Sequence, residues 1–275
     1  MTKNVSNTGL TRLLELTKRP QVVAGKPQSQ VIACVLEFKD DKCTTTSLVR
    51  DGKTSLSHFS IPATHDNSSK CIAIPDIDRL LGVLKYHGKD LTLETDNGKL
   101  RIKSGSKQTT IISDEGGLAF PHSQETIGEW YDKSLGLAQQ IDQNGAYKLR
   151  DGSERKAFMS WSINATELFE AFRCDNMNGQ RLNRYRIAYV GADTEMVITT
   201  GDELKGLTES VFEVAHADGV EDWEATFEGG LENVLKNLDG EINLHFIDFR
   251  PEGQGIRLIL DAANDGYVFQ ASILL

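Results

Sequence analysis

The sequence predicts an α+β fold of two similar domains, each with two helices packed on antiparallel sheets. Three observations predict this class: a length of 275 residues, an apolar content of 39%, and helix and strand patterns that recur in the same order. At roughly 150 residues per domain, the length favours about two domains. We expect one domain over residues 1–113, a connector over 114–154 and a second domain over 155–275.

The first predicted helix lies near the N-terminus. Leu10, Leu13 and Leu14 recur at a spacing that forms one apolar helical face. Pro20 ends this helix, because proline cannot continue one. Alternating segments follow, with a turn at Asp51–Lys53, and we expect strands at Val31–Phe38, Cys43–Arg50 and Ser55–Ile61.

The second predicted helix opens at Pro75 and Asp76, residue types that suit a first helical turn. Its apolar face repeats that of the first helix at an offset of 67, and consists of Ile77, Leu80, Leu81 and Leu84. At the same offset Arg12 matches Arg79, and Lys18 matches Lys85. After Gly88 the pattern alternates around the hairpin signal Asn97-Gly98, so we expect strands at Leu91–Leu93, Leu100–Ile102 and Thr109–Ile112.

The second half repeats this order. Asn164 is an expected N-cap, with Glu167 three residues further along the chain. Leu168, Ala171 and Phe172 form the apolar face of the third helix. At an offset of 63, a fourth helix presents Leu231, Val234, Leu235 and Leu238. We expect the strands after it at Ile242–Phe246, Ile256–Leu260 and Tyr267–Leu275.

The connector between the halves is rich in glycine and only weakly periodic. It is longer than most loops, which makes it a candidate functional segment. We expect a short helix within it, formed by Trp130, Tyr131, Leu135 and Leu137.

The basic residues gather on the predicted helices. The formal charge is −10, which at first sight opposes nucleic-acid binding because phosphates repel a net anion. Four windows over the helices nevertheless sum to +2, while the rest of the chain carries −12; the windows are Thr8–Arg19, Pro75–Lys89, Asn164–Arg184 and Thr226–Leu238. An acidic body with a more basic helical surface suits a protein that encircles or cradles duplex DNA through sequence-independent phosphate contacts.

Several other classes of protein are disfavoured. No apolar run approaches the ~20 residues that span a bilayer, and no secretory signal is visible at the N-terminus. The spacing of the four cysteines suits neither a zinc site nor a disulfide framework, and we expect free thiols in a reducing compartment. We expect no metal and no catalytic residue, because the chain lacks the usual hydrolase, metalloprotease and nucleotide-binding motifs.

Two rival interpretations remain at this point. The first is a small cytosolic enzyme, for which His65 beside Asp66, or His245 with Asp248, would be the best candidate sites. The second is a β-rich phage structural protein, such as a capsid or tail protein. The fourfold recurrence of amphipathic helices argues against the second.

The order of helices and strands resembles that of the DNA sliding clamps, the processivity factors of DNA polymerases. It is most similar to the two-domain trimeric clamps of T-even-type phages and to the proliferating cell nuclear antigen family. The segments that carry the resemblance are Leu10–Leu16, Ile77–Lys85, Leu91–Thr95, Trp161–Phe172 and Phe227–Leu238.

The resemblance implies a ring of three copies that encircles double-stranded DNA, is loaded by an ATP-dependent clamp loader and tethers a DNA polymerase. It implies no cofactor, no membrane and a cytoplasmic location, in the host cytoplasm if the protein is phage-encoded. By analogy with clamp interfaces, Thr109–Ser113 and Ser210–Ala217 are the expected edge strands between copies. The residues expected to face the DNA are Arg12, Lys18, Arg19, Arg79, Lys85, Lys89, Arg173, Arg181, Arg184 and Lys236. Partners are expected to dock on the outer face at the connector, through Leu118, Phe120, Trp130 and Tyr131.

Overall fold

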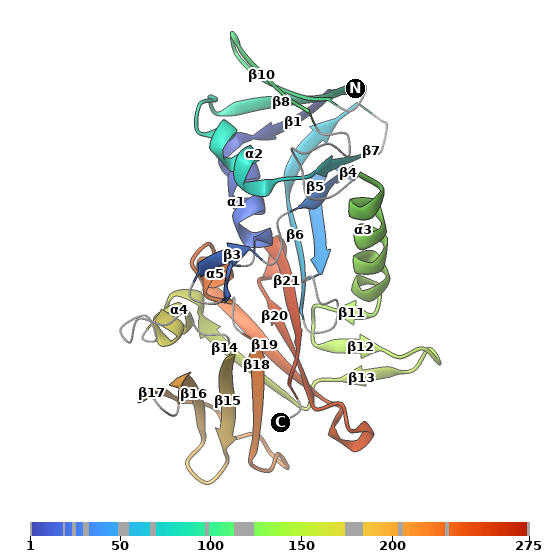
Figure 1. Ribbon diagram of the computed structural model, residues 1–275. Coiled ribbons are helices and arrows are strands. Elements are labelled where there is room, and N and C mark those ends of the chain that lie inside the picture. Colours follow the sequence, from blue (N-terminus) through green and yellow to red (C-terminus); the bar gives the residue numbers. More distant parts are fainter. Residues whose placement is uncertain are drawn as a thin grey trace.

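The computed structural model describes residues 2–18, 20–23, 26–29, 33–48, 55–66, 70–96, 99–112, 124–173, 184–202, 206–228 and 231–273. Figure 1 shows an elongated chain with β10 at its upper end and β17 toward its lower end. None of the helices in these ranges is long and apolar enough to cross a membrane.

The first half contains two helices and two groups of antiparallel strands. A small separate hairpin pairs β2 (Pro20–Val23) with β3 (Lys26–Ser29). The other elements are β1 (Thr2–Ser6), α1 (Asn7–Thr17), β4 (Cys34–Lys39), β5 (Lys42–Leu48), β6 (Ser55–His65), β7 (Lys70–Ile74), α2 (Ile77–Leu84), β8 (Asp90–Asp96), β9 (Lys99–Ser104) and β10 (Lys107–Ile112).

The second half has the same elements in the same order. They are β14 (Met159–Asn164), α4 (Ala165–Arg173), β15 (Arg184–Val190), β16 (Glu195–Asp202), β17 (Gly206–Glu213), β18 (Trp223–Glu228), α5 (Leu231–Leu235), β19 (Glu241–Asp248), β20 (Ile256–Asp261) and β21 (Gly266–Ala271). Two short 3₁₀ turns, η2 (Arg250–Glu252) and η3 (Ala263–Asp265), flank β20.

Strand pairing confirms the internal repeat. In the first half the strands pair in the orders β10-β9-β8-β1 and β7-β4-β5-β6, and in the second half in the orders β21-β20-β19-β14 and β18-β15-β16-β17. By this equivalence β21 takes the place of β10, and β17 takes the place of β6. The limits of the units at 113/114 and 154/155 stay a prediction, and β13 (Glu154–Lys156) continues the connector across the second limit.

The two halves are joined through β6. Its C-terminal end pairs with β1 at Ala63–His65, and its N-terminal end pairs with β21 at Ser55–Phe59. The halves therefore share one 12-stranded sheet. Gly266 makes this junction possible: its φ is 134°, and a Cβ at this position would collide with the carbonyl oxygen of His58.

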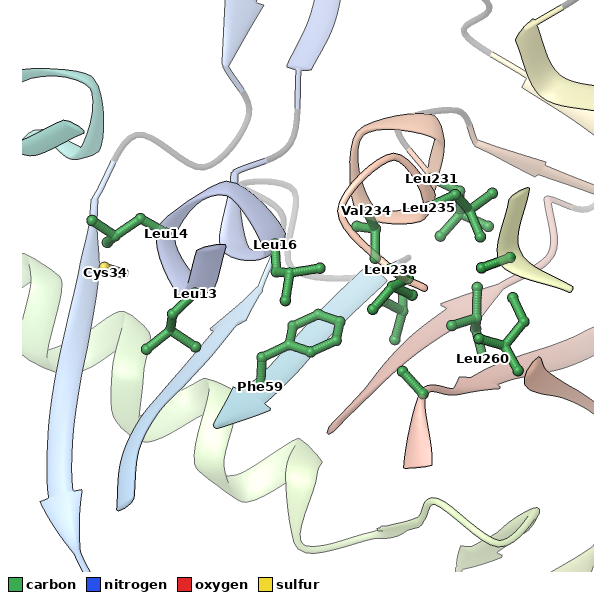
Figure 2. Packing of buried hydrophobic residues seen from close by; sticks show 14 of the residues in the cluster. Leu13, Leu14, Leu16, Cys34, Phe59, Leu231, Val234, Leu235, Leu238 and Leu260 are labelled. Carbon is green, nitrogen blue, oxygen red and sulfur yellow. The ribbon is translucent and has the colours of Figure 1, made fainter. Parts of the chain in front are cut away.

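The main core lies between the sheets and four of the helices. Figure 2 shows Leu13 and Leu16 of α1 beside Phe59 of β6, with Val234 and Leu238 from the region of α5 nearby; all belong to one buried cluster. The apolar faces predicted for α1 and α2 are buried throughout. Burial of these faces, rather than intrinsic helix propensity, holds helices this short.

The described part of the connector, from Gln124 on, contains more regular structure than its sequence suggests. It forms α3 (Gln124–Ala138) and a small sheet of β11 (Ile141–Asp142), β12 (Ala146–Lys148) and β13. The helix expected around Trp130 is confirmed, and it is longer than expected. It packs on the face of β4, β5, β6 and β7 opposite α1, so β4 is buried on both sides: Leu36 and Phe38 join the main core, while Val35 contacts the α3 side.

Some predicted boundaries are wrong. The fourth helix spans only Leu231–Leu235, and the preceding Thr226 and Glu228 belong to β18, which pairs with β15. The expected end of the first helix before Pro20 is confirmed: the helix ends at Thr17, the Lys18 N–H donates to the Leu14 carbonyl oxygen at 3.0 Å, and Pro20 begins β2. The turns expected at Asp51–Lys53 and Asn97-Gly98 lie outside the described residues.

Candidate nucleic-acid interface and partner-binding face

Four helices form a continuous row on one side of the sheets. α2 contacts α1, α1 contacts α5, and α5 contacts α4, while α3 lies on the other side (Figure 1). The row therefore crosses from one half to the other without interruption. This is the surface on which the sequence places its basic residues.

Local capping orients the two helices of the first half. The hydroxyl of Ser6 accepts a hydrogen bond from the Gly9 N–H at 3.0 Å, and the carboxylate of Asp76 accepts one from the Arg79 N–H at 2.8 Å. Each cap satisfies a backbone donor that the first turn of a helix leaves unpaired. In α4, Asn164 accepts from the Thr166 N–H at 2.9 Å, so the expected cap is confirmed.

Four of the predicted DNA-facing residues are exposed on or directly after α2 and α5: Arg79, Lys85, Lys89 and Lys236. They lie on or after α2 and α5, the two helices that flank α1, and they share the row with the exposed Asp78, Glu167 and Glu170, so they give it a local surface that is less acidic than the net charge of −10 suggests. Long-range attraction of a polyanion is governed by such a local surface as well as by the net charge. Arg184 is also exposed, but it begins β15 and does not belong to a helix.

Arg12 and Lys18 are engaged within the chain. The Arg12 guanidinium donates to the Asn237 carbonyl oxygen at 3.0 Å and pairs with the Asp265 carboxylate at 2.9 Å. Lys18 pairs with Asp78 of α2. Arg12 thus connects α1 of the first half to the second half. This structural role differs from the contact with DNA that the sequence predicts for Arg12.

Asn233 of α5 strengthens the same link. Its side-chain amide donates to the carbonyl oxygens of Glu15 at 2.8 Å and Lys18 at 3.0 Å. Sequence reasoning missed Asn233 and Asp265, because their partners lie more than 200 residues away along the chain. Arg19, Arg181 and the side chain of Arg173 lie outside the described residues.

The predicted partner-binding residues do not share one environment. Tyr131 is buried and packs with Val35 and Ile127, and its hydroxyl donates to the Glu37 carboxylate at 2.7 Å. Burial and the adjacent carboxylate raise the pKa of Tyr131. Trp130 is half-buried, and Leu118 and Phe120 lie outside the described residues. Tyr131 therefore fastens α3 to β4.

Both predicted edge strands lie at sheet edges. Within the described residues β10 pairs only with β9, and β17 pairs only with β16. The strand at the second edge ends at Glu213, so residues 214–217 are not part of it. Three large apolar side chains are strongly exposed in the described chain, and two of them lie on β17: Tyr86 at 75%, Leu207 at 48% and Val211 at 55%. Leu207 and Val211 lie on the same side of the edge strand β17, where they alternate with the exposed Glu209 and Glu213.

The fold is shared with solved structures of DNA sliding clamps. The chain is similar to the DNA polymerase sliding clamp from Bacillus subtilis (12% identity, TM-score 0.66, covering 100% of this chain and 64% of that one). It is also similar to the DNA polymerase III beta subunit from Thermotoga maritima, at 15% identity and a TM-score of 0.60, with 100% of this chain and 65% of that chain covered. A third similar structure is the Helicobacter pylori beta clamp bound to a DNA ligase peptide, at 15% identity and a TM-score of 0.58, with 99% of this chain and 66% of that chain covered.

The likeness lies in structure and not in sequence. No protein-family model matches the sequence, and no curated protein matches it either. The chain spans about 65% of the length of the clamps that it matches. Because nearly all of this chain is covered, and because both halves repeat one arrangement of helices and strands, the chain has the fold of the DNA sliding clamps.

Proposed function

We propose that this chain is a DNA sliding clamp: three copies close head to tail into a ring around duplex DNA, and the ring holds a DNA polymerase on its template. The role needs neither a catalytic residue nor a cofactor. The observation that carries the proposal is the junction between the two halves of the chain, where β21 pairs with β6.

We infer the contact between copies from this internal junction. β17 is the second-half equivalent of β6, and β10 is the first-half equivalent of β21. In the described chain β6 and β21 are joined, whereas the outer edges of β17 and β10 have no partner strand. Pairing of β17 from one copy with β10 of the next would repeat the internal junction, and such a head-to-tail contact forms a ring when the rotation closes.

The chemistry of the two edges is complementary. β17 exposes Leu207, Glu209, Val211 and Glu213. At the other end, the edge strand β10 carries Lys107, and the adjacent β9 carries Lys99, Arg101 and Lys103, of which Lys103 already pairs with Glu94 at 2.8 Å. Opposite charges across an interface favour one orientation and suppress others.

The helix row would continue around the ring in the same way. Inside the chain α1 meets α5, so between copies α4 would meet α2 of the next copy. α4 exposes Glu167 and Glu170, and α2 exposes Arg79. The row would then line the hole, with sheets and connector outside.

We propose that the cations of this lining contact phosphates. A ring that slides needs many weak contacts, and exposed charge pairs contribute about 1 kcal/mol or less each. Arg79, Lys85, Lys89 and Lys236 are the proposed principal contacts, with Arg19, Arg173, Arg181 and Arg184 as further members. Arg12 and Lys18 would contribute only to the extent that their internal pairs allow.

Partners are proposed to dock on the outer face. The Helicobacter pylori beta clamp is described with a bound DNA ligase peptide, and by analogy this chain would bind peptide segments of its polymerase and of an ATP-dependent loader. The residues proposed for this contact remain Leu118, Phe120, Trp130 and Tyr131. Because Tyr131 is buried, its proposed role is to hold α3 in position under the bound peptide.

The test is the mass and shape of the assembly. Native mass spectrometry and negative-stain imaging across a concentration series should show particles of three times the 30.4 kDa chain mass with a central hole. A weakly associating ring would appear only at the higher concentrations. A monomer at every concentration up to about 100 µM, which corresponds to association weaker than about −5.5 kcal/mol, would contradict the proposal.

A further inference from the structure

The second half contains a cavity at a place where the first half is closed. In the first half β1 pairs with the C-terminal end of β6, whereas the equivalent strands of the second half, β14 and β17, do not pair with each other in the described chain. A cavity of about 560 Å³ lies there, within the volume range of ligand sites. This β14–β17 cavity is bordered by β14, the first turn of α4, the end of β17 and the start of β19.

The β14–β17 cavity combines aromatic rings with acidic side chains. The rings of Trp161 and Phe212 lie 5.2 Å apart. Three carboxylates also belong to the lining, those of Glu167, Glu213 and Glu241, and none of the nine lining residues is basic. Aromatic rings pack on one another and carboxylates attract cations, so this lining favours an aromatic side chain that has a cation beside it.

The first half departs from the repeat in a different place, the loop after its second helix. Leu84 of α2 is followed by the next buried position, Leu91 of β8, seven residues later. The equivalent Leu238 is followed by Ile242 of β19 only four residues later. The longer loop of the first half carries Tyr86, whose side chain is 75% exposed.

Hydrogen bonds hold this loop against β9 and β10. The Gly88 N–H donates to the Ser104 hydroxyl at 2.8 Å, and Lys107 at the start of β10 donates to the Tyr86 carbonyl oxygen at 3.0 Å. The loop therefore presents an exposed aromatic ring with a lysine beside it, at the edge that would meet β17. A segment whose backbone is already held in place loses less conformational freedom on binding.

The internal junction indicates which surface this loop would meet in a ring. α5 runs along α1 in the opposite direction: Asn233 donates to the carbonyl oxygens of Glu15 and Lys18 near the end of α1. Further along α5, the Asn237 carbonyl oxygen accepts from Arg12, nearer the start of α1. The residues after α5 thus lead toward the first turn of α1. Between copies, the loop after α2 would lead in the same way toward the first turn of α4, which borders the β14–β17 cavity.

The strand pairing leads to the same place. Gly266, at the start of β21, pairs with Phe59 of β6. By the equivalence of the two sheets, Ser210 holds in β17 the position that Phe59 holds in β6. The start of β10, at Lys107, would therefore lie beside Ser210 of the next copy, directly before the cavity residue Val211.

We propose that Tyr86 of one copy fills the β14–β17 cavity of the next copy, with its ring against Trp161 and Phe212 and with Lys107 facing the carboxylates of the lining. The two departures from the internal repeat are then complementary. The junction inside the chain has neither the cavity nor the long loop, whereas the contact between copies has both. This inference rests on the proposed function, because it requires the head-to-tail contact of a ring.

The first test measures association between copies by analytical ultracentrifugation. Tyr86→Ala should weaken association at least about tenfold, or by about 1.4 kcal/mol, whereas Tyr86→Phe should keep it, because the apolar ring makes the contact. The exposure of Tyr86 means that neither substitution should alter the fold of the chain. Equally tight association of Tyr86→Ala and the unaltered chain would overturn the proposal and leave the ring intact.

Disulfide cross-linking then locates the contact, in chains that carry Cys71→Ala because the Cys71 thiol is exposed. Tyr86→Cys combined with Glu213→Cys should link one chain to the next under mild oxidation, and Tyr86→Cys alone should not. Thr110→Cys combined with Leu207→Cys reports the contact of β10 with β17 by itself. Cross-linking of this strand pair without cross-linking of the Tyr86 pair would overturn the proposal alone. Failure of both pairs would overturn the head-to-tail ring together with it.

Discussion

His58 lies on β6 at the junction of the two halves, where its ring stacks on Tyr267 of β21 at 5.2 Å and its Nδ1 is 2.8 Å from the Thr46 hydroxyl. Burial lowers the pKa of His58 below its ordinary value of about 6.5. Glu37 opposes this shift and Lys42 adds to it. The junction is therefore built around a neutral imidazole.

Acidification should weaken the fold through this residue. The unfolded chain takes up the proton at a higher pH than the folded chain does. The stability that neutral His58 contributes is thus complete above about pH 6.5 and is lost as the pH falls toward the lower, folded pKa. His58→Gln should show a smaller fall in Tm between pH 7.5 and 5.5 than the unaltered chain.

The exposed His216 provides the control, and His216→Gln should retain the full fall. His245, whose pKa burial also lowers, keeps part of the acid sensitivity in both variants. If Tm falls as much in His58→Gln as in the unaltered chain, uptake of a proton by His58 on unfolding does not contribute to the acid sensitivity.

Individual contacts between the halves could not be predicted from sequence. Arg12 fits the basic helical pattern as well as Arg79 does, yet its guanidinium pairs with Asp265, 253 residues away. A helical projection reports which face a residue occupies. It does not report which distant segment covers that face, and so it assigns Arg12 and Arg79 the same role.

At the scale of elements, polar contacts as well as apolar packing hold α3 to the sheet: the Tyr131 hydroxyl donates to Glu37 of β4, and the Tyr267 hydroxyl of β21 donates to the Ala138 carbonyl oxygen at 3.3 Å. Tyr131→Phe removes the hydroxyl that donates to Glu37 and leaves a half-buried carboxylate without this donor. We expect a loss of about 1–2 kcal/mol, seen as a Tm lower by several degrees and as faster proteolysis of the connector. Tyr86→Phe is the matched control, since Tyr86 is 75% exposed. Equal effects of the two substitutions would argue against this fastening role.

The edge strand β17 offers a second test. Val211→Lys replaces an exposed apolar side chain of β17 by a cation, on the edge that would meet β10, which carries Lys107, in the next copy. Charged residues on an edge strand block further pairing. Association between copies should weaken at least tenfold, or by about 1.4 kcal/mol, with an unchanged circular dichroism spectrum. Gln139→Lys, at an exposed position directly after α3, should leave association intact. Normal assembly of Val211→Lys would remove β17 from the interface.

Most elements of the two repeats follow from sequence, but the connector does not. Amphipathic spacing locates α1, α2, α4 and α5, because each buries one stripe against the sheets. The strands β11, β12 and β13 have two or three residues each, too few for an alternating pattern to be seen. These short strands are stabilised by packing on the outer face of the sheet, where the ring of Tyr147 stacks on that of Phe269 at a centroid distance of 5.8 Å.

At the scale of the whole molecule, the DNA-facing role can be tested by moving charge only. Lys85, Lys89 and Lys236 are exposed along the helix row, and their joint replacement by Glu should leave a folded chain with weaker DNA association. The slope of log affinity against log salt should fall by about 0.9 for each phosphate that the variant no longer neutralises. Sequence preference should not change, because no base edge is read.

The control carries the same change of charge on the opposite face. Lys133 of α3 with Lys148 and Lys156 of the connector sheet are also exposed, and their joint replacement by Glu should keep the salt slope. Equal slopes for the two triple variants would mean that net charge, and not the helix row, governs association with DNA. Arg12 is left unaltered in this design, so that loss of the Asp265 pair does not confuse the result.

The shared strand β6 also sets an order of events during protein synthesis. Its N-terminal end pairs with β21, and the paired residues Phe59 and Gly266 are more than 200 positions apart. Contacts of such long sequence separation form late, because a large loop must close first. A ribosome will therefore expose the β6 edge for most of the time that it takes to make the chain. During that interval the nascent first half presents the same kind of open edge that β17 presents in the finished protein, and a neighbouring nascent chain can occupy it with its own strand. The feature that joins the two halves thus makes crowded polysomes the place where mispaired chains should first accumulate.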